Sequence, residues 1–165
     1  MFKLIASLAA VFMLTGCGFT PIYGSAGESN IGAKLATVEV APIRDRIGQR
    51  LRNLLLDRIN PGGKPSDPNY QLKVQLYENK QELAVKKSEF STRANLRFLA
   101  KFQLRGINEQ KGQLFSGDVR IITSYNILNS DFGTLAAERD ARRRAVRELS
   151  DDITNRIASY LRNLD

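Results

Sequence analysis

The chain has 165 residues, enough for one domain with a hydrophobic core of its own. It contains no histidine and a single cysteine, which excludes a Cys/His zinc site and the imidazole base of a Ser or Cys catalytic triad. Twenty-five Lys and Arg against 17 Asp and Glu give a net charge of +8. We therefore expect an anionic partner: nucleic acid, an anionic membrane surface, or a phosphorylated glycan or lipid.

The first residues read MFKLIASLAAVFMLT, with Lys3 ahead of an uncharged apolar run. A basic start, a short apolar segment and small residues at its end are typical of an export signal. The run is shorter than the roughly 20 apolar residues of a membrane-spanning helix. We predict that residues 1–16 are a signal peptide that is cleaved off; the alternative is a buried N-terminal helix.

Cys17 follows this segment directly, in Leu14-Thr15-Gly16-Cys17. An aliphatic residue and two small residues before a cysteine resemble a bacterial lipobox, because small side chains fit a peptidase that cuts before a cysteine already alkylated by diacylglycerol. We predict that Cys17 is the lipidated first residue of the mature chain. The alternative is an unpaired cysteine in an exported protein. Gly18 at the next position is compatible with the outer membrane.

Residues 17–33 are predicted to be the lipidated N-terminus and a flexible tether, since GSAGESNIGA is rich in Gly and Ser. Residues 34–165 are predicted to form a single α/β domain. It begins with a short strand over 34–43, which Pro42 ends. A helix over 43–60 follows, with one apolar stripe: Ile43, Ile47, Leu51, Leu54, Leu55 and Ile59.

Three further strands are predicted over 69–78, 92–104 and 114–126, each with apolar residues at alternate positions. Gly117 inside the last of them indicates a bulge or a close approach of another group. A long helix follows over 134–164, and Ser130 or Asp131 is suited to cap its start.

The predicted order β-α-β-β-β-α, with one apolar face on each strand and one apolar stripe on each helix, indicates an α+β fold. We expect a two-layer sandwich in which two helices pack on one face of a four-stranded sheet. The opposite sheet face should then carry basic residues: Lys73, Arg93, Arg97, Lys101 and Arg120.

Two segments carry a resemblance to a known family. CGFTPIYG at residues 17–24, and Ser124-Tyr125-Asn126 before an Ala- and Arg-rich final helix, resemble the LPS-assembly lipoproteins of the LptE family, of alphaproteobacterial type. The resemblance implies a non-enzymatic outer-membrane lipoprotein without cofactor. Members plug the large β-barrel LptD, assist its assembly and are thought to bind lipopolysaccharide. It also implies a palmitate-bearing anchor, with the domain on the periplasmic side and in the barrel lumen.

Two basic clusters compete for the anionic ligand. The candidate lipopolysaccharide-binding residues are Arg93, Arg97 and Lys101 on one sheet face, with Lys86 and Lys87 in the preceding loop, because Arg binds phosphate through paired hydrogen bonds. The alternative is a solvated or barrel-facing polar surface. The second cluster, on the final helix, is interpreted as a charged solvent face with ion pairs such as Glu138–Arg142 and Arg144–Glu148. The alternative is a contact with the barrel wall or an anionic lipid. Its members are Arg139, Arg142, Arg143, Arg144 and Arg147.

Other function classes are less well supported. A scaffold subunit of another envelope or secretion complex stays open as the alternative. A lipid-anchored hydrolase would need a carboxylate or Ser/Lys site, and Glu78, Glu82 and Asp118 are isolated acids in the sequence. The predicted element order is distantly similar to that of RNA-binding sheets, but export and the lack of stacking aromatics on the basic face argue against nucleic acid.

Overall fold

The computed structural model describes residues 31–83, 93–107 and 112–164. The predicted signal peptide, Cys17, and the candidate ligands Lys86 and Lys87 lie outside these ranges. The described elements follow in the order α2 (Ile31–Ala36), β1 (Val38–Val40), α3 (Asp45–Ile59), β2 (Tyr70–Leu83), β3 (Arg93–Gly106), β4 (Gly112–Asn126) and α4 (Asp131–Arg162).

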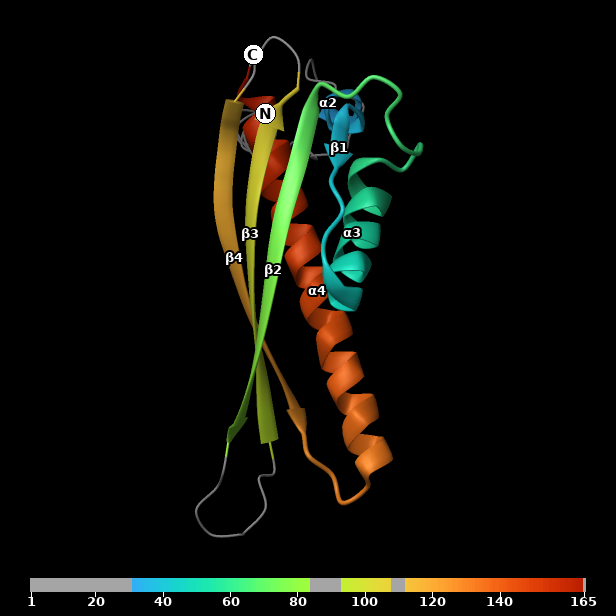
Figure 1. Cartoon of the computed structure of the whole chain (residues 1–165), viewed down its shortest axis with the longest axis vertical. Helices are drawn as coiled ribbons and strands as arrows, with labels where there is room; N and C mark the ends of the chain where they lie inside the picture. The colour runs from blue at the N-terminus through green and yellow to red at the C-terminus, as the bar shows by residue number, and fades with distance from the viewer. Residues whose placement is uncertain (1–30, 84–92, 108–111, 165) are drawn as a thin grey trace, which may run out of the picture.

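The four strands form one sheet in the order β1-β2-β3-β4. β1 runs parallel to β2, and the long strands β2, β3 and β4 pair antiparallel. α3 and α4 lie together on one face of this sheet (Figure 1). The predicted α+β sandwich is therefore confirmed, with two long helices on one face of a four-stranded sheet.

The N-terminal boundary differs from the prediction. Residues 31–33, assigned to the tether, and 34–36, assigned to a strand, form α2 instead. Ile31 and Leu35 are four residues apart, share one helical face and are both buried. The folded domain thus starts at least three residues earlier than predicted, and the strand predicted over 34–43 is reduced to Val38–Val40.

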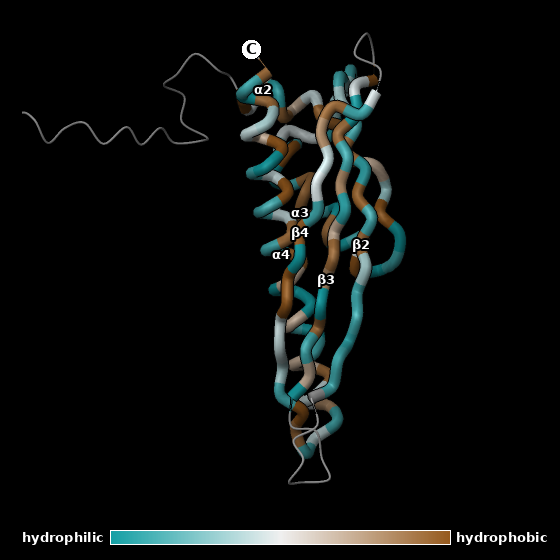
Figure 2. The backbone as a smooth tube through the Cα atoms, turned by 90° about the vertical axis from the view of Figure 1, so that its left-hand side faces the viewer, coloured by the Kyte–Doolittle hydropathy of each residue, from teal (hydrophilic) through white to brown (hydrophobic). Residues whose placement is uncertain are grey.

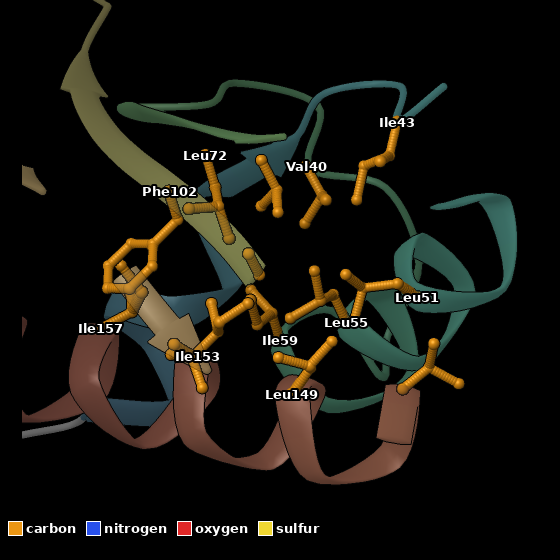
Figure 3. Packing of buried hydrophobic residues seen from close by; sticks show 14 of the residues in the cluster. Val40, Ile43, Leu51, Leu55, Ile59, Leu72, Phe102, Leu149, Ile153 and Ile157 are labelled. Atoms are coloured by element: carbon orange, nitrogen blue, oxygen red, sulfur yellow. The ribbon is translucent and has the colours of Figure 1, made fainter. Parts of the chain in front are cut away.

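The core lies between the sheet and the two helices. Alternation along β3 buries every second side chain, as predicted. Side chains from both helices meet beneath β1, β2 and β3 (Figure 3), and burying each of them contributes about 1.5–3 kcal/mol. The labelled members of this cluster are Val40, Ile43, Leu51, Leu55, Ile59, Leu72, Phe102, Leu149, Ile153 and Ile157.

The two helices differ greatly in length. α3 has 15 residues and α4 has 32, which correspond to roughly 22 Å and 48 Å. α3 therefore accompanies α4 along only part of the sheet (Figure 1). We call the remaining part the distal half: residues 76–83 of β2 and the paired residues 93–100 of β3 and 119–126 of β4. In Figure 2 the part of β2 that belongs to the distal half is mostly teal, the colour of hydrophilic residues.

The predicted close approach at Gly117 is confirmed. Gly117 pairs with Phe102 across β3 and β4, and a Cβ at this position would lie 2.8 Å from Cζ of Phe102. The ring of Phe102 thus fills the space of the missing side chain. It also contacts the ring of Phe115 at a centroid distance of 5.7 Å.

We predict that Gly117→Ala destabilises the fold by about 1–3 kcal/mol, because the added methyl group overpacks against a ring that is fully buried. Urea unfolding of the purified protein measures the change. The matched control is Gly62→Ala, since no atom lies within 4 Å of a Cβ built at Gly62. Equal unfolding midpoints for Gly117→Ala and the native protein would contradict this packing.

Candidate functional site

The sheet face that points away from the helices, which we call the outer face, carries the predicted basic residues. Lys73, Arg93, Arg97, Lys101 and Arg120 are all exposed there, in phase with the exposed positions of their strands. Arg105 is a further exposed cation on this face. Sequence reasoning missed it because the predicted strand ended at Leu104, whereas β3 continues to Gly106.

The candidate ligand residues are spread along β3 rather than gathered at one point. Arg97 and Lys101 lie about 13 Å apart, and Arg93 lies a similar distance farther along the strand, as the rise per residue requires. A hollow of about 470 Å³ adjoins Lys101 and is also lined by Lys73 and Arg105. The structure therefore groups Lys101 with cations from β2 and the end of β3, and leaves Arg93 at the distal end.

Three apolar residues form a diagonal row on the outer face, beside Arg97 and Lys101. Tyr77 pairs with Leu99, and Ile122 pairs with Arg97 one step away. Tyr77 is 52% exposed and Ile122 is 60% exposed. The sequence could have revealed this row, since these three apolar residues occupy strand positions of a face that is otherwise mostly polar.

The cations around this row differ in their pairing. Arg120 forms an ion pair with Asp118 at 2.9 Å. Lys101 faces Asp118 across the strands, but the carboxylate of Asp118 is engaged by Arg120. Arg97 and Lys101 make no ion pair with any residue inside the described ranges. Two cations thus remain available beside an exposed apolar row.

The inner face of the distal half holds a polar network beside the buried apolar side chains of β3, such as Leu96 and Phe98. The hydroxyl of Tyr125 donates to Glu138 Oε2 at 2.9 Å. Arg142 binds Glu138 Oε1 at 2.6 Å and Glu78 Oε1 at 2.7 Å. Lys80 Nζ lies 3.6 Å from Glu138 Oε2 and 5.8 Å from the centre of the Tyr125 ring. These side chains join β2, β4 and α4 near the first turns of α3.

The ion pairs of α4 follow the prediction only in part. The pair Glu138–Arg142 is confirmed. The pair Arg144–Glu148 is wrong, because Arg144 instead binds Asp140 and donates from Nη2 to the backbone oxygen of Ser124 at 3.3 Å. Arg144 is thereby drawn toward the sheet rather than along the helix. The cluster is thus only partly the solvent face that the sequence indicated.

The three isolated acids of the sequence each have a basic partner. Glu78 pairs with Arg142, Glu82 with Lys80, and Asp118 with Arg120. The described part of the chain contains no cluster of three or more potential metal ligands. Nor does any helix within the described ranges combine the length and apolar character that a membrane crossing requires.

Comparison with known proteins decides the family. The family model described as LptE, lipopolysaccharide-assembly, matches residues 35–157, which include all four strands, α3, and α4 as far as Ile157. This chain belongs to the LptE family. A search of the curated proteins finds no match.

Solved structures share the fold of this LptE-family chain. A lipoprotein structure from Caulobacter crescentus CB15 superposes with a TM-score of 0.66 at 22% identity, covering 83% of this chain and 99% of the other. Rare lipoprotein B from Shewanella oneidensis superposes with a TM-score of 0.62 at 14% identity, covering 77% of this chain and 97% of the other. A minor lipoprotein from Acinetobacter baumannii superposes with a TM-score of 0.56 at 20% identity, covering 74% of this chain and 91% of the other.

In this LptE-family chain the Ser124-Tyr125-Asn126 segment has a structural role. The side chain of Ser124 donates to Asn95 Oδ1 at 2.8 Å on the neighbouring strand. Tyr125 is 4% exposed and reaches α4 through Glu138. Ser124 therefore links β4 to β3, and Tyr125 links β4 to the N-terminal part of α4.

Nearby charges and burial shift the pKa of Glu138 in opposite directions. Burial alone would raise the pKa of this carboxyl, but the hydrogen bond from Tyr125 and the charges of Arg142 and Lys80 outweigh it and lower the pKa below its ordinary value of 4.5. The hydrogen bond with Tyr125 is also the largest cause that raises the pKa of Lys80. Burial raises the pKa of the Tyr125 hydroxyl. Glu138 and Lys80 thus keep their charges at neutral pH, and the Tyr125 hydroxyl stays neutral.

We predict that Glu138→Gln costs about 1–3 kcal/mol of unfolding free energy at pH 7, because Arg142 and Lys80 lose a charged acceptor. The pKa of Glu138 is lowered in the folded state. Its contribution is therefore complete above its unfolded pKa and disappears as the pH falls through the lower folded pKa.

The difference between native protein and Glu138→Gln should accordingly shrink when urea unfolding is repeated from pH 7 down to pH 3. Glu148→Gln is the control, since Glu148 is exposed on the same helix and forms no ion pair within the described residues. A difference for Glu138→Gln that stays constant over this range would contradict the role of its charge.

Proposed function

We propose that this chain is a non-enzymatic outer-membrane lipoprotein of the lipopolysaccharide translocon. In this proposal it sits as a plug inside the large β-barrel LptD, assists assembly of that barrel, and binds lipopolysaccharide. Membership of the LptE family, over residues 35–157, supports the assignment to lipopolysaccharide assembly. The ion pairs of Glu78, Glu82 and Asp118 favour structural roles for these acids.

The observation that carries ligand binding is the pair of cations beside the apolar row. Lipid A presents phosphate groups next to acyl chains, so its binding site needs cations next to apolar surface. Arg97 and Lys101 are exposed without an ion pair to the described residues, and Leu99, Tyr77 and Ile122 lie between or beside them. Arg97 is suited to paired hydrogen bonds with a phosphate, and Lys101 to a single charged contact.

The proposal includes the remaining predicted ligands. Arg93 lies at the distal end of β3, next in sequence to the segment that contains Lys86 and Lys87. A ligand seated on the apolar row could extend toward this end of the strand. We expect Arg93 to contribute less than Arg97, because it lies about 20 Å along the strand from Leu99 in the row.

We predict that Arg97→Glu and Lys101→Glu each weaken binding of purified lipopolysaccharide about ten-fold or more, because a charge-assisted hydrogen bond contributes about 1.5–3 kcal/mol. Binding is measured with the detergent-solubilised, lipidated protein by displacement of a fluorescent lipopolysaccharide.

Arg147→Glu is the matched control, since Arg147 is exposed on α4, away from the outer face, and its reversal changes the net charge equally. Affinity that falls to the same extent in all three variants would indicate nonspecific charge attraction. Unchanged affinity in Arg97→Glu and Lys101→Glu would remove the outer face as the ligand site.

The proposed anchor is tested separately. Cys17→Ser should leave the precursor uncleaved before residue 17 and unlabelled by radioactive palmitate, because the thiol that accepts diacylglycerol is absent. Gly18→Asp keeps this thiol and should be labelled like the native chain. Cleavage and labelling of Cys17→Ser at native levels would show that the anchor lies elsewhere.

A further inference from the structure

β2 has an edge that β1 covers only at its start. The backbone N–H of Tyr70 donates to Thr37 O at 3.3 Å, and Leu72 O accepts from Ala41 N–H at 2.9 Å. Even-numbered residues of β2 therefore direct their backbone groups toward β1. β1 pairs only with residues 70–72. Beyond Val40 the chain leaves the edge of β2 through Pro42 and begins α3 at Asp45.

The backbone groups of Leu76, Glu78, Lys80 and Glu82 consequently point to an open edge. No strand among the described residues lies beside them on that side, and no described side chain donates to their carbonyl groups. Residues 77–82 are exposed. Figure 1 shows β1 beside only the first part of β2.

The opposite edge of the sheet is protected in a different way. On β4 the backbone oxygens of Ser124 and Asp118 accept hydrogen bonds from Arg144 at 3.3 Å and from Arg156 at 3.4 Å. Side chains from α4 thus occupy edge carbonyls of β4, a common protection against strand addition. The edge of β2 beyond Leu72 lacks this protection in the described structure.

A basic cleft adjoins the open edge of β2. It has a volume of about 800 Å³ and lies between the first turns of α3, the exposed face of α4 and Glu78 of β2. Five arginines line it, with Asp45 and Glu78 as the only acids among the lining residues. The arginines are Arg46, Arg50, Arg139, Arg142 and Arg143.

These arginines are only partly neutralised. Arg142 is held by Glu78 and Glu138, and Arg143 pairs with Asp140 at 2.8 Å. Arg46, Arg50 and Arg139 form no ion pair with described residues. Arg46 and Arg50 are four positions apart on α3, where like charges repel each other. An anion in the cleft would relieve this repulsion.

We propose that an acidic, extended segment of a partner protein binds in this cleft and adds as a strand to β2 along Leu76–Glu82. Its backbone would pair with the open edge, and carboxylates at alternate positions would face Arg46, Arg50 and Arg139, because successive side chains of a strand point to opposite faces. A phosphate group could satisfy the arginines but not the strand edge. The proposal does not depend on lipopolysaccharide binding, which we assign to the opposite face of the sheet.

A synthetic peptide tests both halves of the proposal. The probe is a fluorescein-labelled nonapeptide of alternating glutamate and valine, and its binding to the detergent-solubilised, lipidated chain is followed by fluorescence anisotropy. We expect saturable binding that Arg46→Glu combined with Arg50→Glu weakens at least ten-fold. Both side chains are exposed, so the fold should persist, and the neutral variant Arg46→Gln with Arg50→Gln should lose part of the affinity. Arg147→Glu should bind like the native chain.

The strand-addition half is tested with the same peptide methylated at every second backbone nitrogen, which keeps the charges but removes the donors of the ladder. We expect at least ten-fold weaker binding, and protection from hydrogen exchange at the amides of Leu76, Glu78 and Lys80 only with the unmethylated peptide. Equal binding of the methylated peptide would overturn the proposal in favour of a simple anion site such as phosphate fills. Absence of binding, or affinity unchanged by the Arg46 and Arg50 reversals, would also overturn it.

Discussion

The architecture depends on the difference in length between α3 and α4. α4 follows the long strands along their whole extent, whereas α3 is about half as long and leaves the distal half of the sheet with a single helix. Beneath α3 the layers are held by apolar side chains such as Leu55 and Ile153. Beyond α3 the apolar core continues between α4 and β3, with Leu96 and Phe98 buried, and the network around Tyr125, Glu138 and Arg142 additionally ties β2 to α4. Hydrogen bonds and buried charges with complete partners are stable there, because each member satisfies the others.

The structure presents two chemically different surfaces, of which only the cleft is related to the shortness of α3. On the outer face an apolar row lies among cations, an arrangement suited to an amphiphile with phosphate groups. On the helix side, the first turns of α3 line a cleft that holds arginines beside an open strand edge. This arrangement is suited to an acidic polypeptide. A protein that must meet both a glycolipid and a protein partner would need two such surfaces, and here they lie on opposite sides of one thin sheet.

The sequence predicted most of the fold because its strongest signals are local. Alternation from Ala94 to Leu104 and the apolar stripe of α3 each follow from one element's own period. α2 was missed because its two buried residues, Ile31 and Leu35, are too few to establish a helical period beside a Gly- and Ser-rich segment. The outer-face cations were predicted from strand phase alone. The polar network and the cleft could not be predicted, because Glu78 and Arg142 are 64 positions apart and meet only when three elements are packed.

The central claim is that this LptE-family chain works as a partner of a large outer-membrane barrel. Purification of the lipidated chain from detergent-solubilised outer membranes, with mass spectrometry of what remains bound, tests it most directly. The account predicts recovery of one large β-barrel protein in equimolar amount. Recovery of the chain alone, or together with an unrelated envelope or secretion complex, would contradict it.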